Sequence, residues 1–271
     1  MPVSYPLGVL NEHLHTRVGA GLFDISHMQL YDVSGPDAAD LLAKACPLEA
    51  SGQAVGASKY TFLLNDRAGI IDDLIVTRLA DDRFIVVSNA ARAAVDLAEL
   101  QSAGKGLDCI ITALERVFLA LQGPLAAAVM SDAGFAVDAM SFMSGMEPKP
   151  GWFLARSGYT GEDGFEIAVS LDEAVALAEK LTADNRVEWI GLAARDSLRL
   201  EAGLCLYGQD LDENTDPVSA GLIWAIPKAL RAGGGFTGAD ALAEIIAKGP
   251  ARKRVGLRAE GRQPVRGGAE L

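Results

Sequence analysis

The sequence predicts a globular protein of about two domains in which helices and strands are mixed along the chain. The chain has 271 residues, of which 50% are hydrophobic, so it can bury a sizeable core. Segments with the alternating apolar and polar pattern of strands are interspersed with segments whose apolar residues recur at helical spacing. Some strand segments follow one another through short loops, as in β-hairpins.

The first hundred residues are expected to contain both kinds of element. In order they are a helix at 7–17, a strand at 29–33, a helix from about 37 to 46, strands at 59–64, 74–79 and 83–87, and a helix at about 90–101. Asn89 precedes this last helix, at a position from which its side chain can cap the first turn. His13 and His15 diverge on the first helix because they are two residues apart, so we expect no metal between them.

The second half of the chain continues the mixture. The expected elements are strands at 109–114 and 117–121, a short alanine-rich helix, a loop at 132–150, a strand that contains Glu166, and helices at 171–181 and 191–203. Met140, Met143 and Met146 in the loop are expected to fill core space rather than to form a binding surface.

The charge of the chain excludes some classes of partner. A formal net charge of −12 and a pI near 4.7 argue against binding to nucleic acid or to anionic membranes, because both need a basic surface. Basic residues nevertheless gather near the end of the sequence, namely Lys248, Arg252, Lys253, Arg254, Arg258, Arg262 and Arg266. This basic segment is either a solvated stretch or a contact for an acidic partner.

The cysteines and the hydropathy pattern bear on the compartment. Cys46, Cys109 and Cys205 are odd in number and far apart, which favours neither a disulfide framework nor a metal knuckle. No window holds the 18 or more apolar residues of a membrane span, and the N-terminus lacks a signal-peptide pattern. We therefore expect a soluble protein of a reducing compartment, either cytoplasmic or organellar. The family resemblance described below narrows the organelle to the mitochondrial matrix if the source is a eukaryote.

Two adjacent carboxylates, Asp72 and Asp73, interrupt an otherwise apolar stretch at 69–76. An unpaired charge is expensive to bury, so the acids need a reason to be there. One reason is a turn, since Asp is common where the chain reverses and Gly69 fits a hairpin loop. The other is function. Successive side chains of a strand point to opposite faces, so we expect one acid at most in a cavity and the other in solvent.

A third acid, Glu166, lies in an apolar strand after a glycine-rich stretch. Gly158, Gly161 and Gly164 allow a tight turn and close backbone approach there. A carboxylate at this place can accept two N–H donors from a heterocycle such as a pterin. The alternative is an edge-strand Glu that faces water.

Two arginines, Arg195 and Arg199, are i, i+4 neighbours on one face of the helix at 191–203. They either hold a carboxylate together or form a surface charge ladder with Asp196 and Glu201.

The segment Gly233 to Gly238 matches the GxGxxG pattern of dinucleotide sites. The six residues before it do not read as a buried strand, and no βαβ unit surrounds it, so we expect no nucleotide there. A P-loop, an HExxH motif and a GxSxG motif are all absent from the sequence.

Four ordered stretches carry a resemblance to a known family. They are GLFDISHM at 21–28, IIDDLIV at 70–76, SGYTGEDGFE at 157–166 and GLAARDSLRLEAG at 191–203. Together they resemble the T-protein, the aminomethyltransferase of the glycine cleavage system. Compared with that family, the sequence is expected to be truncated at both ends.

The resemblance implies an α+β, multi-lobed fold that binds folate in a central channel, with two lobes interleaved in the sequence. By this likeness, 1–24 with 105–190 form the first lobe, 25–104 with 191–247 form the second, and 248–271 only begin a C-terminal barrel lobe that is largely missing.

The resemblance also implies the chemistry. The family takes an aminomethyl group from the lipoyl arm of an H-protein, releases ammonia and forms 5,10-methylenetetrahydrofolate, with tetrahydrofolate as the acceptor substrate. Asp73 matches the catalytic acid beside the reacting folate nitrogens. The matches to folate-binding positions are Glu166, Arg195, Tyr159, Asn89, Tyr60 and Met28. No metal, nucleotide, nucleic acid or membrane is implied.

Three other functions stay open. A folate-binding relative of the same fold assists iron–sulfur assembly without transferring a group, but its Lys-Gly-Cys-Tyr-x-Gly-Gln-Glu segment is not matched by residues 203–210. A folate domain of a sarcosine or dimethylglycine dehydrogenase would need a flavin domain. A truncated chain that folds but is inactive is the third.

Overall fold

Two β-sheets form the centre of the molecule, of which the computed structural model describes residues 1–258, 260 and 261. The five-stranded sheet contains β2 (Gln29–Ser34), β3 (Ser58–Leu64), β4 (Ile70–Ala80), β5 (Arg83–Ser88) and β6 (Ile110–Leu114), in the order β3-β4-β5-β2-β6. The six-stranded sheet contains β1 (Ala20–Asp24), β7 (Val117–Gln122), β8 (Ser144–Met146), β9 (Phe153–Arg156), β10 (Gly164–Val169) and β11 (Val187–Trp189), in the order β11-β1-β7-β10-β9-β8. Neighbours in both sheets run antiparallel, apart from the parallel pair of β1 and β11.

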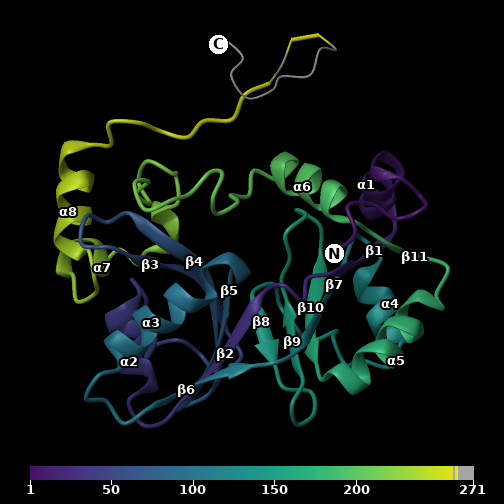
Figure 1. The fold of residues 1–271 in the computed structure, drawn as a ribbon, viewed down its shortest axis with the longest axis horizontal. Helices are drawn as coiled ribbons and strands as arrows, with labels where there is room; N and C mark the ends of the chain where they lie inside the picture. Colours follow the sequence, from purple (N-terminus) through teal and green to yellow (C-terminus); the bar gives the residue numbers. More distant parts are fainter. Residues whose placement is uncertain (259, 262–271) are drawn as a thin grey trace.

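Helices cover the outer face of each sheet (Figure 1). The helices are α1 (Val9–Val18), α2 (Ala38–Ala45), α3 (Ala93–Ala103), α4 (Ala126–Asp132), α5 (Leu171–Thr182), α6 (Leu192–Glu201), α7 (Leu230–Gly233) and α8 (Ala239–Lys248), with short 3₁₀ turns at Ala90–Arg92 and Ile223–Ala225. Helices α2 and α3 bury their apolar residues against the five-stranded sheet, and α4 and α5 against the six-stranded sheet. In α5, for example, Ala174, Leu177 and Leu181 are buried, which is the spacing of one helical face.

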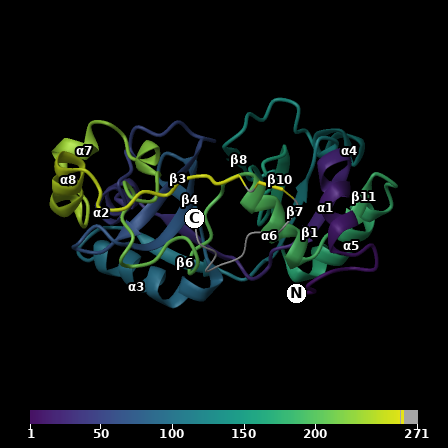
Figure 2. The same cartoon turned by 90° about the horizontal axis from the view of Figure 1, so that it is seen from above.

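The inner faces of the two sheets pack against each other. This inter-sheet core contains aromatic and aliphatic side chains from both sheets, such as Phe23, Phe118 and Phe153 on one side and Leu30, Ile85 and Val87 on the other. Helix α6 adds Ala194 and Leu198 to the same cluster. Seen from above, each sheet and its own helices make up one half of the molecule (Figure 2). Side chains on the inner faces of the two sheets therefore lie between the two halves.

The mixed α+β architecture expected from the sequence is confirmed. The chain begins in the six-stranded sheet with β1, builds the whole five-stranded sheet with β2 to β6, and returns to the first sheet with β7. Strand β6 lies in the range 105–190, which is predicted for the first lobe. It nevertheless pairs with β2, which lies in the range predicted for the second lobe. The lobe boundaries themselves stay a prediction.

Three local expectations were wrong. Asp72 and Asp73 lie inside β4 and not in a turn, because the chain reverses earlier, at Asn65 to Gly69. The side chain of Asn89 makes no capping bond to the following helix and turns instead toward these two acids. The loop at 132–150 contains β8, which pairs with β9 at the edge of its sheet.

Within the described residues, no helix is long and apolar enough to cross a membrane. In the basic segment, Arg254 contacts the chain itself, because its guanidinium donates to the carbonyl oxygens of Ala220 and Gly203. Arg262 and Arg266 of the same segment lie outside the described residues.

Candidate functional site

Asp73 is held by two donors on the inner face of β4. Its Oδ2 atom accepts a hydrogen bond from the hydroxyl of Tyr60 at 2.8 Å, and its Oδ1 atom accepts one from the side-chain amide of Asn89 at 2.9 Å. Tyr60 comes from the neighbouring strand β3, and Asn89 follows the end of β5. Three adjacent strands of one sheet therefore fix this carboxylate.

We expected the other acid, Asp72, to face solvent. It is buried instead, and none of its surface is exposed. It points to the opposite face of β4, which α2 and α3 cover with the core of the five-stranded sheet. Both of its oxygens accept hydrogen bonds from Asn89, one from the side chain and one from the backbone N–H. A strand with both faces covered has no solvent side, so the alternation rule alone misplaced this residue.

The surroundings of Asp73 raise its pKa to about 6. Burial is the main cause and the charge of Asp72 the second, while the hydrogen bonds from Tyr60 and Asn89 act in the opposite direction. A carboxylate with a pKa near neutrality can accept a proton and return it within one reaction cycle. The position and the pKa of this group suit general acid–base catalysis.

Glu166 lies on β10 in the other half of the molecule, where it is partly buried. Its Oε2 atom accepts a hydrogen bond of 2.6 Å from the hydroxyl of Ser157. Burial raises the pKa of this carboxyl group, and the Ser157 hydroxyl and the charge of Arg195 lower it in part. The reading of Glu166 as a water-facing edge residue is wrong, because β10 lies between β7 and β9 inside the sheet.

Arg195 on α6 lies over the ring of Tyr159, with its guanidinium carbon 4.5 Å from the ring centroid. The hydroxyl of Tyr159 donates to the carbonyl oxygen of Cys205 at 2.5 Å, which holds the ring in place. Burial lowers the pKa of Arg195, and the negative charge of Glu166 counteracts this effect.

The two arginines of α6 do not act as a pair. Arg199 is only 2% exposed and is bound by Asp196 and Asp210 and by the carbonyl of Leu204. The pair of Arg199 with Asp196 belongs to the charge ladder that was one of the two alternatives from the sequence, although Arg199 is buried and not on the surface. Arg195 remains on the side of Tyr159 and Glu166.

Electrostatic effects connect the residues of the two halves. The charge of Asp73 raises the pKa of Tyr159, and the charge of Arg195 lowers the pKa of Glu166. The fold therefore brings Asp73, Tyr60 and Asn89 together through hydrogen bonds and places Tyr159, which carries Arg195 on its ring, close enough for the charge of Asp73 to raise its pKa. Met28 packs on the inter-sheet core, to which α6 also contributes.

Sequence reasoning missed two aromatic and polar neighbours of the site. The indole of Trp224 stacks on Tyr60, with ring centroids 5.7 Å apart and an interplanar angle of 18°, and 64% of Trp224 is exposed. Ser157, the partner of Glu166, is the other. In the sequence Trp224 belongs to a mostly apolar run without a period, so no signal distinguished it from a core residue.

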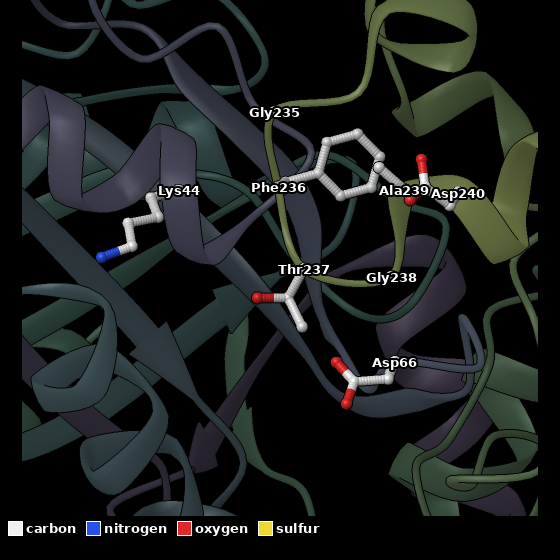
Figure 3. A pocket seen from close by; sticks show the side chains of 8 residues that line it. All are labelled: Lys44, Asp66, Gly235, Phe236, Thr237, Gly238, Ala239 and Asp240. Atoms are coloured by element: carbon white, nitrogen blue, oxygen red, sulfur yellow. The ribbon is translucent and has the colours of Figure 1, made fainter.

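The last four residues of the glycine motif, Gly235 to Gly238, line a separate surface pocket of about 480 Å³ (Figure 3). The motif connects α7 to α8, so a helix stands where a dinucleotide site needs a strand. Asp66 and Asp240 also line the pocket. In Figure 3 the amino group of Lys44 is turned away from them, and it donates to the carbonyl of Ala103.

Potential metal ligands do not converge in the part of the chain that the structure describes, where no group of three His, Cys, Asp or Glu side chains could hold an ion. His13 contacts Ser197 and Glu201, whereas His15 contacts the backbone carbonyls of Ala20 and Arg186.

Residues 1–229 match the family model described as the GCVT N-terminal domain. The whole chain is 40% identical over 287 residues to the mitochondrial aminomethyltransferase of Flaveria anomala, of which it covers 69%. The corresponding protein of Gallus gallus is 43% identical over 274 residues, covering 96% of this chain and 69% of that protein.

The fold agrees with these matches. The crystal structure of glycine cleavage system aminomethyltransferase T from Bartonella henselae superimposes with a TM-score of 0.96 at 59% sequence identity, covering 98% of this chain and 74% of that one. The chain therefore belongs to the GCVT family of aminomethyltransferases, the transferases of the glycine cleavage system.

Proposed function

We propose that this aminomethyltransferase uses tetrahydrofolate as acceptor and a lipoylated H-protein as donor. The aminomethyl group on the dihydrolipoyl sulfur passes to folate, ammonia leaves, and 5,10-methylenetetrahydrofolate forms. In the balanced reaction the carbon–sulfur and carbon–nitrogen bonds of the aminomethyl group break, and two carbon–nitrogen bonds to folate form. The two N–H protons of folate end on the thiol and on ammonia.

The observation that carries this proposal is the environment of Asp73 in a chain of this family. The reaction must move protons from the folate nitrogens to the two leaving groups, which calls for a base whose pKa is near neutrality. The pKa of Asp73 is about 6, and Tyr60 and Asn89 hold its carboxylate in one orientation. We assign to Asp73 the transfer of these protons and the stabilisation of positive charge on the methylene carbon.

We assign the binding of the pterin ring to the residues of the other half. The carboxylate of Glu166 can accept two N–H bonds from the amino and ring nitrogens of a pterin. Arg195 and Tyr159 offer a guanidinium and an aromatic ring beside it, held by their mutual contact. Among the remaining folate-binding assignments, Tyr60 and Asn89 rest on their hydrogen bonds to Asp73, and Met28 rests on its packing against the inter-sheet core.

The experiment that tests the proposal has two stages. Calorimetry with tetrahydrofolate measures binding, and the release of ammonia from an aminomethylated H-protein then measures transfer. We expect binding and a release that depends on both folate and the aminomethyl group, so controls omit folate or use unloaded H-protein. Binding without release would contradict the proposal and favour a folate-binding relative of the iron–sulfur assembly type, or an inactive chain.

The compartment follows from the same proposal. An enzyme that uses H-protein as its donor works where lipoylated H-protein is made, which is the mitochondrial matrix in a eukaryote and the cytoplasm in a bacterium. Fractionation of source cells, with H-protein as the marker, would test this.

A further inference from the structure

Asp96 on α3 is a buried acid that the proposed reaction does not use. None of its surface is exposed, and within the described residues neither of its carboxyl oxygens has a hydrogen-bond partner. The hydroxyl of Ser88 is buried in the same way. An ionised carboxylate without donors is costly in a protein interior, so this arrangement requires an explanation.

Asp72 lies next to Asp96 and faces it from β4. The two side chains interact directly, and each is buried. Burial raises the pKa of both carboxyl groups, and the charge of Asp96 raises that of Asp72 further. Two ionised carboxylates in contact repel each other and offer only acceptor atoms.

The groups around this pair compensate its charge only in part. The groups that shift the pKa of either acid, or whose own pKa the pair shifts, are Asp73, Asn89, Ser88, Tyr31, Cys46, Arg92 and Tyr207. Among these seven, Arg92 is the cation. Its charge lowers the pKa of Asp96, but its guanidinium is bound to Glu213 and to the carbonyl of Ile71 and donates no hydrogen bond to the pair. The hydroxyl of Tyr31 donates to the carbonyl of Ala93.

We propose that Asp72 and Asp96 share one proton, and that Asp96 is thereby a positioning residue for Asp73. The shared proton supplies the donor that Asp96 lacks and converts the repulsion between the two acids into a hydrogen bond. The pair then carries one negative charge instead of two, as in other carboxylate pairs that share a site. This inference rests on the catalytic role proposed for Asp73.

The link from the pair to Asp73 is the side chain of Asn89. Its Nδ2 atom donates to Asp72 Oδ1 and to Asp73 Oδ1, each at 2.9 Å, so the two amide hydrogens are divided between the two acids. While Asp72 stays in place, the amide cannot rotate without losing both bonds. Asp96 holds Asp72 from behind and so fixes the carboxylate that faces the reacting groups.

The test compares three substitutions on α3. In Asp96→Asn the amide can donate to Asp72 in place of the shared proton, so we expect turnover close to that of the unaltered protein. Asp96→Ala removes the support, and we expect turnover to fall on the order of tenfold to a hundredfold with little change in the KM for folate. Glu99→Gln, a partly buried position one turn away, is the matched control and should leave both constants unchanged.

An infrared measurement reports the proton itself and does not depend on catalysis. The difference spectrum between the unaltered protein and Asp96→Asn at neutral pH should contain the carbonyl band of a protonated carboxylic acid.

The pH dependence of unfolding is a second test of the shared proton. A raised pKa means that the folded state keeps a proton that the unfolded state has lost. Stability therefore falls as the pH rises from about 4 toward 8, about tenfold in the folding constant per pH unit, and this slope should be smaller in Asp96→Asn.

The outcomes separate this inference from the proposed function. A difference spectrum without a carboxylic acid band overturns the shared proton. If Asp96→Ala has the same turnover and the same KM for folate as the control Glu99→Gln, Asp96 does not position Asp73. If Asp96→Ala does not fold, the turnover of Asp96→Asn, the infrared band and the pH dependence of unfolding decide. An active Asp73→Asn protein would instead defeat the role of Asp73, while the carboxylic acid band would remain.

Discussion

Replacing Asp73 with asparagine is the most direct test of the proposed chemistry, because the structure allows the change without moving the neighbours. The carbonyl oxygen of the new side-chain amide can accept the bond from Asn89. Its NH₂ group can donate to the oxygen of Tyr60, which is 2.8 Å from the present carboxylate. The shape and the bond from Asn89 are kept, the bond with Tyr60 is reversed in direction, and the ability to accept a proton is lost.

The expected loss of turnover is large and the loss of binding small. A positioned general base contributes about 10²- to 10⁴-fold to a rate, which corresponds to about 3–5 kcal/mol of barrier. We expect a reduction in ammonia release within this range, with folate affinity by calorimetry changed by a few-fold at most. In the unaltered protein, turnover should fall as the pH drops below about 6, because only the ionised carboxylate accepts a proton. Asp73→Asn should lack this acid limb.

The control for this substitution is Asp82→Asn, an exposed position in the loop after the same strand. It should leave turnover unchanged. If Asp73→Asn released ammonia within about tenfold of the unaltered rate, or kept the acid limb, Asp73 would not be the base, whatever its pKa.

Three further substitutions test the surroundings of the site. Glu166→Gln should lose mainly folate affinity, because an amide cannot accept two N–H donors through both of its polar atoms, and calorimetry with unchanged affinity would contradict this. Tyr60→Phe removes a hydrogen bond that stabilises the ionised form of Asp73, so the pKa and the acid limb of turnover should shift above about 6. Gly158→Ala would place a methyl carbon 1.8 Å from Oε1 of the buried Gln122, and we expect a loss of about 1–3 kcal/mol in the free energy of unfolding.

Two of these substitutions have a matched comparison. Gly52→Ala adds the same methyl group where the nearest neighbouring atom would be 3.7 Å away, so it should not lower the melting temperature. Tyr5→Phe changes a tyrosine that stacks on Trp189, away from Asp73, and should leave the acid limb where it is. Equal melting temperatures for the two glycine variants would contradict the close packing around Gln122.

Only the residue type and its local pattern were needed to single out the main acids. A carboxylate inside an apolar strand is costly wherever the strand lies, so the pair Asp72 and Asp73 and the single acid Glu166 were conspicuous before their neighbours were known. The family resemblance, and not the pattern, selected Asp73 from the pair. Helices such as α5 and α6 were also predictable within a few residues, because helical periodicity and stop signals are local properties.

The sequence by itself thus determined the family, the mixed architecture and the acids that interrupt its strands. Tertiary structure decided what each acid faces, because covering both sides of β4 buries Asp72 against α3 and leaves Asp73 to Tyr60 and Asn89. It also turned Asn89 from an expected helix cap into the link between two carboxylates, and brought Trp224 onto Tyr60 from a distant segment. These contacts join residues far apart in the chain, and such pairings depend on how the sheets pack, which local periodicity does not record.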